Sequence, residues 1–167
     1  MKRSITAALL AGALSLAAPA LAGTYELSIG ETTLDASGRD IPGLAINGTI
    51  PAPTLRFQEG EDLVIHVTNT LDETSSIHWH GIILPTDQDG VPGLSYDGIA
   101  PGTTHTFRFP AQQSGTYWYH SHSGLQEQSG VYGAIVIEPK AREPFRYDKE
   151  YVVVLSDWKD TKPERVL

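Results

Sequence analysis

Four of the six histidines in this 167-residue chain come as two His-x-His pairs. The first pair is His78 and His80, in the string SIHWHG, and the second is His120 and His122, in YWYHSHSG. Residues two apart on a β-strand face the same side, with their Cα atoms roughly 6.5 Å apart. Two such strands side by side would bring four imidazoles to one spot, and imidazole is a common metal ligand.

The other residue types restrict which metal these histidines could bind. The sequence has no cysteine, and its one methionine is Met1, so the ligands must be nitrogen or oxygen atoms. Imidazole without thiolate suits copper, zinc, nickel or iron, and copper leads in the usual order of affinity, with zinc behind it. The spacing leaves open whether each pair shares one ion or binds two neighbouring ions. A mononuclear zinc or iron enzyme that uses three of the four histidines is therefore an alternative to copper.

The remaining histidines and the aromatic residues have simpler interpretations. His66 alternates with polar residues and is expected to face solvent, and His105 shares a strand face with two phenylalanines and is expected to pack against them. On a regular strand Trp118 lies on the side of the histidines, whereas Tyr117 and Tyr119 point away from it. We expect these aromatic side chains to fill space around the site.

Strands must position the histidine pairs. Short apolar or alternating runs are separated by Gly, Pro, Asn and Asp about every ten residues, and no long helical period follows residue 22. This pattern predicts an all-β protein, an antiparallel β-sandwich. The predicted strands are residues 24–29, 54–57, 62–69, 76–84, 104–109, 115–120, 130–138 and 150–156.

The chain divides into a leader, one full domain and a further segment. Residues 1–22 have a basic start, a short apolar run and an Ala-Leu-Ala end, which predict a secretion signal and a periplasmic or secreted protein, with no membrane association after its removal. Residues 23–139 are predicted to form the sandwich, 140–149 a linker, and 150–167 the start of a second, incomplete domain. The alternative is that 150–156 completes the first sandwich.

The charge balance argues against one class of partner. The chain has 20 acidic and 12 basic residues, a net charge of -8, and removing the signal makes it more negative. Nucleic acids and anionic membranes are bound by clustered Lys and Arg, so neither is an expected partner.

Several strings together resemble the first cupredoxin (plastocyanin-like) domain of the multicopper oxidases, and most of all that of the periplasmic copper-resistance oxidases of the CopA/PcoA type. They are SIHWHGIILP, DGVPGLS, GTYWYHSHSGLQEQ and GVYGAIVIEP. NGTIPAPTLRFQEGE resembles the family's early signature, although Ala52 stands where a glycine is common. The resemblance spans about residues 24 to 160 and implies a Greek-key β-sandwich of the cupredoxin-like class.

The resemblance also implies a function. His78 would bind a type 2 copper ion, and three residues would bind the type 3 pair: His80, His120 and His122. These ligands are half of a trinuclear copper cluster that reduces dioxygen to water while cuprous ion, a phenol or another small reductant is oxidised, with a role in copper tolerance. Asp89 would be the acidic residue that helps to move protons near the cluster. From the residues alone, Asp89 would be an ordinary turn residue.

Departures from the family pattern leave a second hypothesis open. In the family, the other cluster histidines and the type 1 copper site with its cysteine lie in a C-terminal domain, so the resemblance implies that remaining C-terminal domains act as partners of this chain. The chain starts with Lys2-Arg3 rather than a twin-arginine signal and lacks methionine-rich segments. The alternative function is a stand-alone exported module that binds or buffers copper without turnover.

Overall fold

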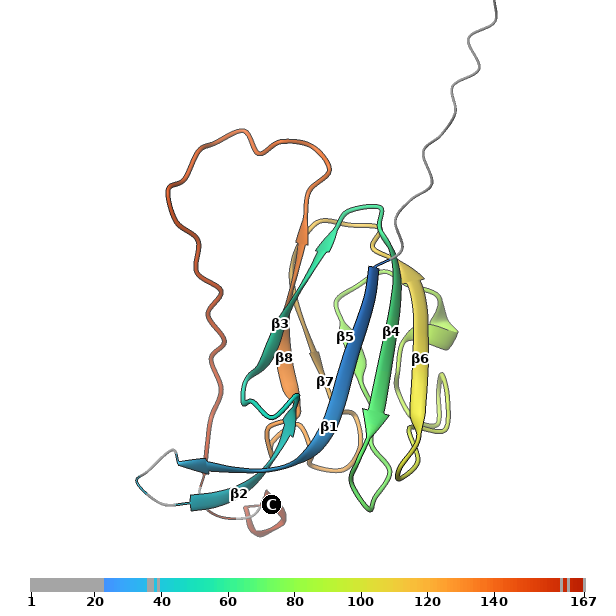
Figure 1. Cartoon of the computed structure of the whole chain (residues 1–167), viewed down its shortest axis with the longest axis vertical. Helices are drawn as coiled ribbons and strands as arrows, with labels where there is room; N and C mark the ends of the chain where they lie inside the picture. The colour runs from blue at the N-terminus through green and yellow to red at the C-terminus, as the bar shows by residue number, and fades with distance from the viewer. Residues whose placement is uncertain (1–22, 36–37, 39, 160, 162, 167) are drawn as a thin grey trace, which may run out of the picture.

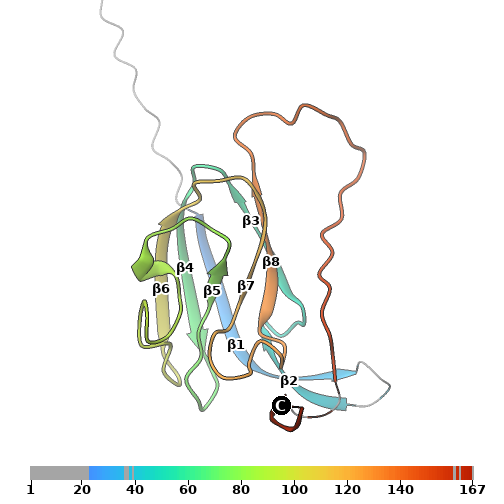
Figure 2. The same ribbon diagram turned by 180° about the vertical axis from the view of Figure 1, so that it is seen from behind.

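The computed structural model describes residues 23–35, 38, 40–159, 161 and 163–166. The predicted signal, 1–22, lies outside the described residues. Two four-stranded sheets pack face to face, as Figures 1 and 2 show from opposite sides. The first sheet has the order β2-β1-β4-β6 and the second the order β3-β8-β7-β5. The strands are β1 (Gly23–Asp35), β2 (Asp40–Ile46), β3 (Ala52–Gln58), β4 (Asp62–Asn69), β5 (His78–His80), β6 (Thr104–Pro110), β7 (Gly115–His120) and β8 (Tyr132–Glu138).

The prediction of an all-β sandwich is confirmed. Apart from strands, the described residues contain two short 3-10 turns, η1 (Thr86–Gln88) and η2 (Pro163–Arg165), and no α-helix. None of the described helical segments is long and apolar enough to cross a membrane.

The prediction that the sandwich is antiparallel is wrong at two strand pairs. β1 pairs with β4 in parallel, and β3 pairs with β8 in parallel, while the other pairs are antiparallel. The reason is the path of the chain, which leaves the first sheet after β2, forms β3 in the second sheet, and returns beside β1 as β4. A strand that returns to its sheet by such a crossover can run in the same direction as its neighbour.

The predicted strand limits agree with the structure where side-chain alternation is regular. Residues 62–69 and 115–120 are β4 and β7 as predicted. The predicted strand 76–84 is reduced to β5, which ends before Gly81 with its φ of +81°. β2 was not predicted, because Pro42 and Gly43 within it are both residue types that strands usually lack.

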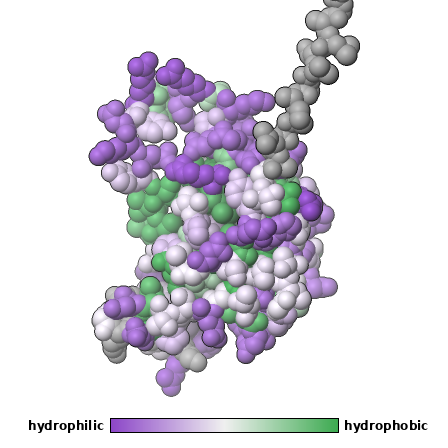
Figure 3. All heavy atoms as spheres, viewed as in Figure 1, coloured by the Kyte–Doolittle hydropathy of each residue, from purple (hydrophilic) through white to green (hydrophobic). Residues whose placement is uncertain are grey.

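The prediction of a strand at 150–156 is wrong: the segment is extended but pairs with neither sheet. It loops away from β8 and runs back along the second sheet, where it lines a cavity with residues of β7 and β8 (Figures 1 and 2). Tyr151, Val153 and Leu155 are exposed, and Figure 3 shows hydrophobic residues on the surface along this part of the chain. A strand needs hydrogen-bonded neighbours, and the described residues provide none here. The assignments of 140–149 as a linker and 150–167 as the start of a second domain remain predictions.

The core between the sheets fixes which way the histidine strands face. Trp79 of β5 and Tyr119 of β7 are both fully buried, and Trp79 packs edge-on against Phe107 of β6 with ring centroids 5.2 Å apart. Because side chains alternate along a strand, the residues on either side of Trp79 must face away from this core. Burial of one tryptophan therefore orients both His78 and His80.

Candidate metal centre

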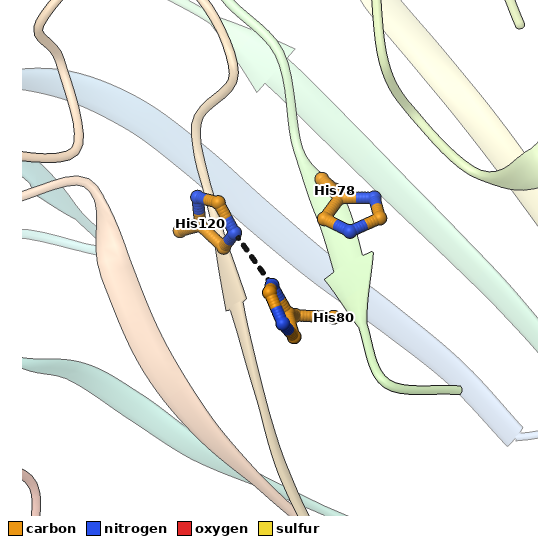
Figure 4. Close-up of side chains that lie close together, drawn as sticks. All are labelled: His78, His80 and His120. Carbon is orange, nitrogen blue, oxygen red and sulfur yellow. Dashed lines mark hydrogen bonds between the residues drawn. The ribbon is translucent and has the colours of Figure 1, made fainter.

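The histidines meet because β5 and β7 are neighbours in the second sheet. These strands pair antiparallel with His78 opposite His120, Trp79 opposite Tyr119, and His80 opposite Trp118. Directly opposite residues lie on the same face of a sheet. Figure 4 shows the result: His78 and His80 from β5 and His120 from β7 point toward one another.

The distances among these three side chains fit a shared metal ion. Ligand nitrogens of His78, His80 and His120 all lie within 4.8 Å of one another. His80 Nδ1 and His120 Nε2 are 3.2 Å apart. Two nitrogens that bind one ion at about 2.0 Å with a near-tetrahedral angle are about 3.3 Å apart. The nitrogen donor set, without thiolate, is one that copper accepts.

His122 is near this group but not part of it. Its ring centroid lies 5.3 Å from those of His78 and His120. β7 ends at His120, so the second pair does not lie on one continuous strand as the spacing suggested. Instead, the backbone N–H of His122 donates to Ser76 Oγ at 2.8 Å, which holds the residue beside the first pair.

Hydrogen bonds fix the orientation of two of the rings. His78 Nδ1 lies 2.8 Å from the backbone oxygen of Asp89 and 3.5 Å from its Oδ2. His120 Nδ1 lies 3.0 Å from the backbone oxygen of Ser121 and 2.7 Å from Glu127 Oε2. A neutral imidazole that donates Nδ1–H to an oxygen keeps its lone pair on Nε2. Both rings therefore leave Nε2 free to bind a metal ion, and Asp89 lies beside His78.

The environment of His120 favours the form that binds metals. Burial lowers the pKa of His120, and the neighbouring His78 and His122 lower it further, while Glu127 and the carbonyl of Ser121 act in the opposite direction. Only the neutral imidazole has a lone pair for a metal ion. Trp118 stacks on the same ring at a centroid distance of 4.0 Å and an interplanar angle of 14°. This is the side on which the sequence predicted Trp118.

The other two histidines belong to the first sheet and do not join the group. His105 packs between Tyr96 and Phe107, with ring centroids 4.9 and 4.6 Å away, and its pKa is lowered by burial. His66 Nδ1 is 2.8 Å from Thr106 Oγ1, and the residue is half-buried rather than fully exposed.

The loop after β7 contributes contacts that the sequence patterns do not predict. The side-chain oxygen of the buried Gln126 accepts hydrogen bonds from Ser75 Oγ at 2.7 Å and Ser121 Oγ at 2.9 Å. Its Nε2 donates to the carbonyl of Thr74 at 3.0 Å. These bonds join the segment before β5 to the loop that carries His122. Both Gln126 and Glu127 stand in the string LQEQ, but a loop has no periodicity from which such contacts could be predicted.

Comparison with known proteins identifies the family. The sequence profile described as "Multicopper oxidase" matches residues 29–142. The chain is 57% identical over 148 residues to a copper resistance protein A homolog from Pseudomonas syringae pv. tomato, covering 88% of this chain and 25% of that protein. It is 54% identical over 151 residues to copper resistance protein A from Escherichia coli, covering 90% and 25%. The chain belongs to the multicopper oxidase family, as its resemblance predicted, and spans about a quarter of the length of these relatives.

Solved structures agree on the fold. The structure matches Fet3p, a multicopper oxidase that functions in iron import, with a TM-score of 0.80, 30% identity, and coverage of 87% of this chain and 28% of that one. It matches a multi-copper oxidase from Pseudomonas thermotolerans with a TM-score of 0.73, 34% identity, and coverage of 77% and 32%. The sandwich is therefore of the cupredoxin-like class, and membership of this family implies copper as the metal.

Proposed function

We propose that this chain is the copper-binding N-terminal part of a multicopper oxidase and supplies half of the ligands of a trinuclear copper cluster. The observation that carries the proposal is the convergence of His78, His80 and His120, whose ligand nitrogens lie within 4.8 Å of one another across β5 and β7. Copper bound there would supply the one-electron steps by which dioxygen is reduced to water while a small reductant, cuprous ion or a phenol, is oxidised.

The four histidines would divide between two kinds of copper site. His78 would hold the type 2 ion, and the type 3 pair would be held by His80, His120 and His122. The 3.2 Å separation of His80 Nδ1 and His120 Nε2 supports a shared ion for that pair. The ring centroids of His78 and His120 are 5.4 Å apart. Each of these two centroids lies 5.3 or 5.4 Å from the centroids of His80 and His122. This spread of the four rings supports more than one ion in the cluster.

Two other side chains would assist the chemistry. Asp89 Oδ2 lies 3.5 Å from His78 Nδ1, and its side chain is 36% exposed, so the carboxylate would lie between the solvent and the centre, where the proposed proton transfer needs an acidic group. Trp118 covers one face of the His120 ring and excludes water from it.

The proposed setting is copper tolerance outside the cytoplasm. The predicted signal at 1–22 supports export to the periplasm or beyond, and two relatives are named as copper resistance proteins. The remaining cluster ligands and the type 1 copper would come from C-terminal domains outside this sequence. That the chain covers 25% of those relatives supports this division.

A stand-alone copper-binding module is the second candidate function. It is favoured by one observation: three imidazoles that converge can hold an ion by themselves. The two candidates differ in the mass of the native protein from its source. A mass far above 18.1 kDa, with a further His-x-His and a His-Cys-His past Leu167, supports the oxidase, whereas a native mass near that value supports the module.

Metal titration tests the site itself. The chain, its His120→Ala/His122→Ala variant and a His66→Gln/His105→Gln variant are titrated with Cu²⁺ against a competing chelator. Both variants lose two histidines, but only the first loses ligands of the proposed centre. We expect Cu²⁺ affinity to fall at least about tenfold in the first variant, and to stay unchanged in the second. Equal affinity of the first variant and the unmodified chain would show that the site is elsewhere.

A further inference from the structure

We propose that Glu127 is a positioning residue of the metal centre: its carboxylate accepts the Nδ1–H of His120 and strengthens Cu²⁺ binding at Nε2 of the same ring. This inference rests on the proposed copper-binding function. Glu127 belongs to neither His-x-His pair and lies in the loop after β7, seven residues past the end of that strand.

The contact is short and partly shielded from water. Glu127 Oε2 lies 2.7 Å from His120 Nδ1, and the His120 side chain is 5% exposed while that of Glu127 is 48% exposed. A hydrogen bond from imidazole to an ionised carboxylate is shorter and stronger than one between neutral groups. The His120 ring is thus enclosed by the protein, while the Glu127 carboxylate that contacts it reaches the solvent.

The loop holds Glu127 over His120. The preceding residue, Gln126, is anchored by its buried side chain, and its backbone oxygen accepts from the N–H groups of Ser129 at 3.1 Å and Val131 at 3.0 Å. The backbone oxygen of Glu127 accepts from Gly130 N–H at 3.0 Å. Three hydrogen bonds to the backbone oxygens of Gln126 and Glu127 therefore fix the backbone that carries the carboxylate.

The arrangement repeats one already seen at the first histidine pair. His78 Nδ1 has a backbone oxygen at 2.8 Å and the Asp89 carboxylate at 3.5 Å. His120 Nδ1 has a backbone oxygen at 3.0 Å and the Glu127 carboxylate at 2.7 Å. The first histidine of each pair is thus supported by one carbonyl and one carboxylate. The Glu127 carboxylate lies closer to its histidine than the Asp89 carboxylate does.

The contact determines which proton must move when a metal binds. With Nδ1–H donated to Glu127, His120 directs its Nε2 lone pair at His80 Nδ1, 3.2 Å away, so His80 carries its proton on Nδ1 in the metal-free chain. Binding one ion to both nitrogens requires His80 to become the Nε2–H tautomer. His80 is exposed, so water can exchange that proton without a net change of charge.

The carboxylate should favour the more highly charged copper ion. A carboxylate that accepts the Nδ1–H makes His120 Nε2 a stronger donor, and its negative charge adds an attraction that is larger for Cu²⁺ than for Cu⁺. A side chain that only supported the loop would affect both ions by the same factor. The ratio of the two affinities therefore separates the proposed role from a structural one.

The test compares Glu127→Ala and Glu127→Gln with the unmodified full chain. Glu31→Gln serves as the control because it removes the same charge from an exposed position on β1, in the other sheet. Cu²⁺ affinity is measured by chelator competition, and Cu⁺ affinity by an anaerobic competition with a chromogenic chelator. Removing such a supporting partner typically weakens metal binding about 10- to 100-fold.

We expect Glu127→Ala to lose Cu²⁺ affinity in that range and Cu⁺ affinity by a smaller factor. Glu127→Gln, which keeps an acceptor for Nδ1–H, should recover part of the loss, and Glu31→Gln should behave like the unmodified chain. The inference is overturned if both Glu127 variants bind Cu²⁺ normally, or if they lose Cu²⁺ and Cu⁺ affinity equally with no advantage for glutamine. A failure of the unmodified chain to bind copper would instead remove the proposed function, together with this inference.

Discussion

Replacing Gly90 with alanine tests whether the loop that carries Asp89 holds His78 in position. Gly90 has a φ of +79°, and a Cβ there would lie 1.7 Å from the backbone oxygen of Ile77. Gly93 in the same loop has a φ of +80°, and its Cβ would have no atom within 4 Å. The two positions have nearly the same φ and differ in the steric clash, so Gly93→Ala is a matched control.

The expected size of the effect follows from these two terms. A residue with a Cβ in the left-handed region costs about 1–2 kcal/mol, and overpacking against a fixed neighbour adds about 1–3 kcal/mol. We therefore expect Gly93→Ala to lower the free energy of unfolding by about 1–2 kcal/mol and Gly90→Ala by about 2–5 kcal/mol. Relieving the clash would move the Asp89 carbonyl away from His78 Nδ1. Cu²⁺ affinity should then fall about tenfold for Gly90→Ala, with no change for Gly93→Ala.

Two measurements check this prediction. Urea unfolding of the metal-free chain gives the difference in free energy of unfolding, and chelator competition gives the Cu²⁺ affinity. If the two variants unfold at the same urea concentration and bind Cu²⁺ equally well, the clash with Ile77 and the support of His78 by this loop are both refuted.

Three further predictions concern stability and the network beside the site. Tyr119→Phe removes the 2.7 Å hydrogen bond from the tyrosine hydroxyl to the Pro53 carbonyl. It should lower the free energy of unfolding by about 1 kcal/mol without changing Cu²⁺ affinity. A loss of affinity would contradict the placement of this side chain in the core. Burial lowers the pKa of His105 below its ordinary value of 6.5, so the unfolded chain binds the proton more tightly than the folded chain. The contribution of neutral His105 to stability is therefore lost as the pH falls below 6.5 toward the pKa of the folded state. His105→Gln should therefore reduce the loss of stability of the metal-free chain between about pH 7 and 5 in urea unfolding, and an unchanged pH dependence would oppose this assignment. Gln126→Ala leaves the hydroxyls of Ser75 and Ser121 without their acceptor and should cost about 1–3 kcal/mol in urea unfolding, whereas a neutral result would mean that other partners replace it.

Sequence patterns predict strands here when one face of the strand is buried and the other is not. Leu63, Ile65 and Val67 alternate with more exposed residues, and the limits of β4 follow from them. Alternation says which face is buried but not which strand is the neighbour, so the parallel pairing of β1 with β4 could not be predicted in this way. Segment 150–156 shows the opposite case, because it has the composition of a strand but no pairing partner among the described residues.

The site could be predicted as far as it depends on strand geometry. The spacing of His78 and His80 predicts a shared face, and the pairing of β5 with β7 brings His120 to the same place. The position of His122 and the contact of Glu127 with His120 depend on a loop of irregular turns. His122 is held by a hydrogen bond to Ser76, which is distant in sequence, and Glu127 is placed by turns that have no repeating pattern.

X-ray absorption spectroscopy of the copper-loaded chain is the decisive test of the proposed copper centre, because it reports which atoms surround the metal. We expect a first shell of nitrogen at about 2.0 Å, with the outer-shell scattering of imidazole rings and no sulfur. The imidazole scattering should decrease in the His120→Ala/His122→Ala variant and stay unchanged in the His66→Gln/His105→Gln variant. An oxygen-only shell, or a spectrum that the first variant leaves unaltered, would contradict a copper centre built by the two His-x-His pairs.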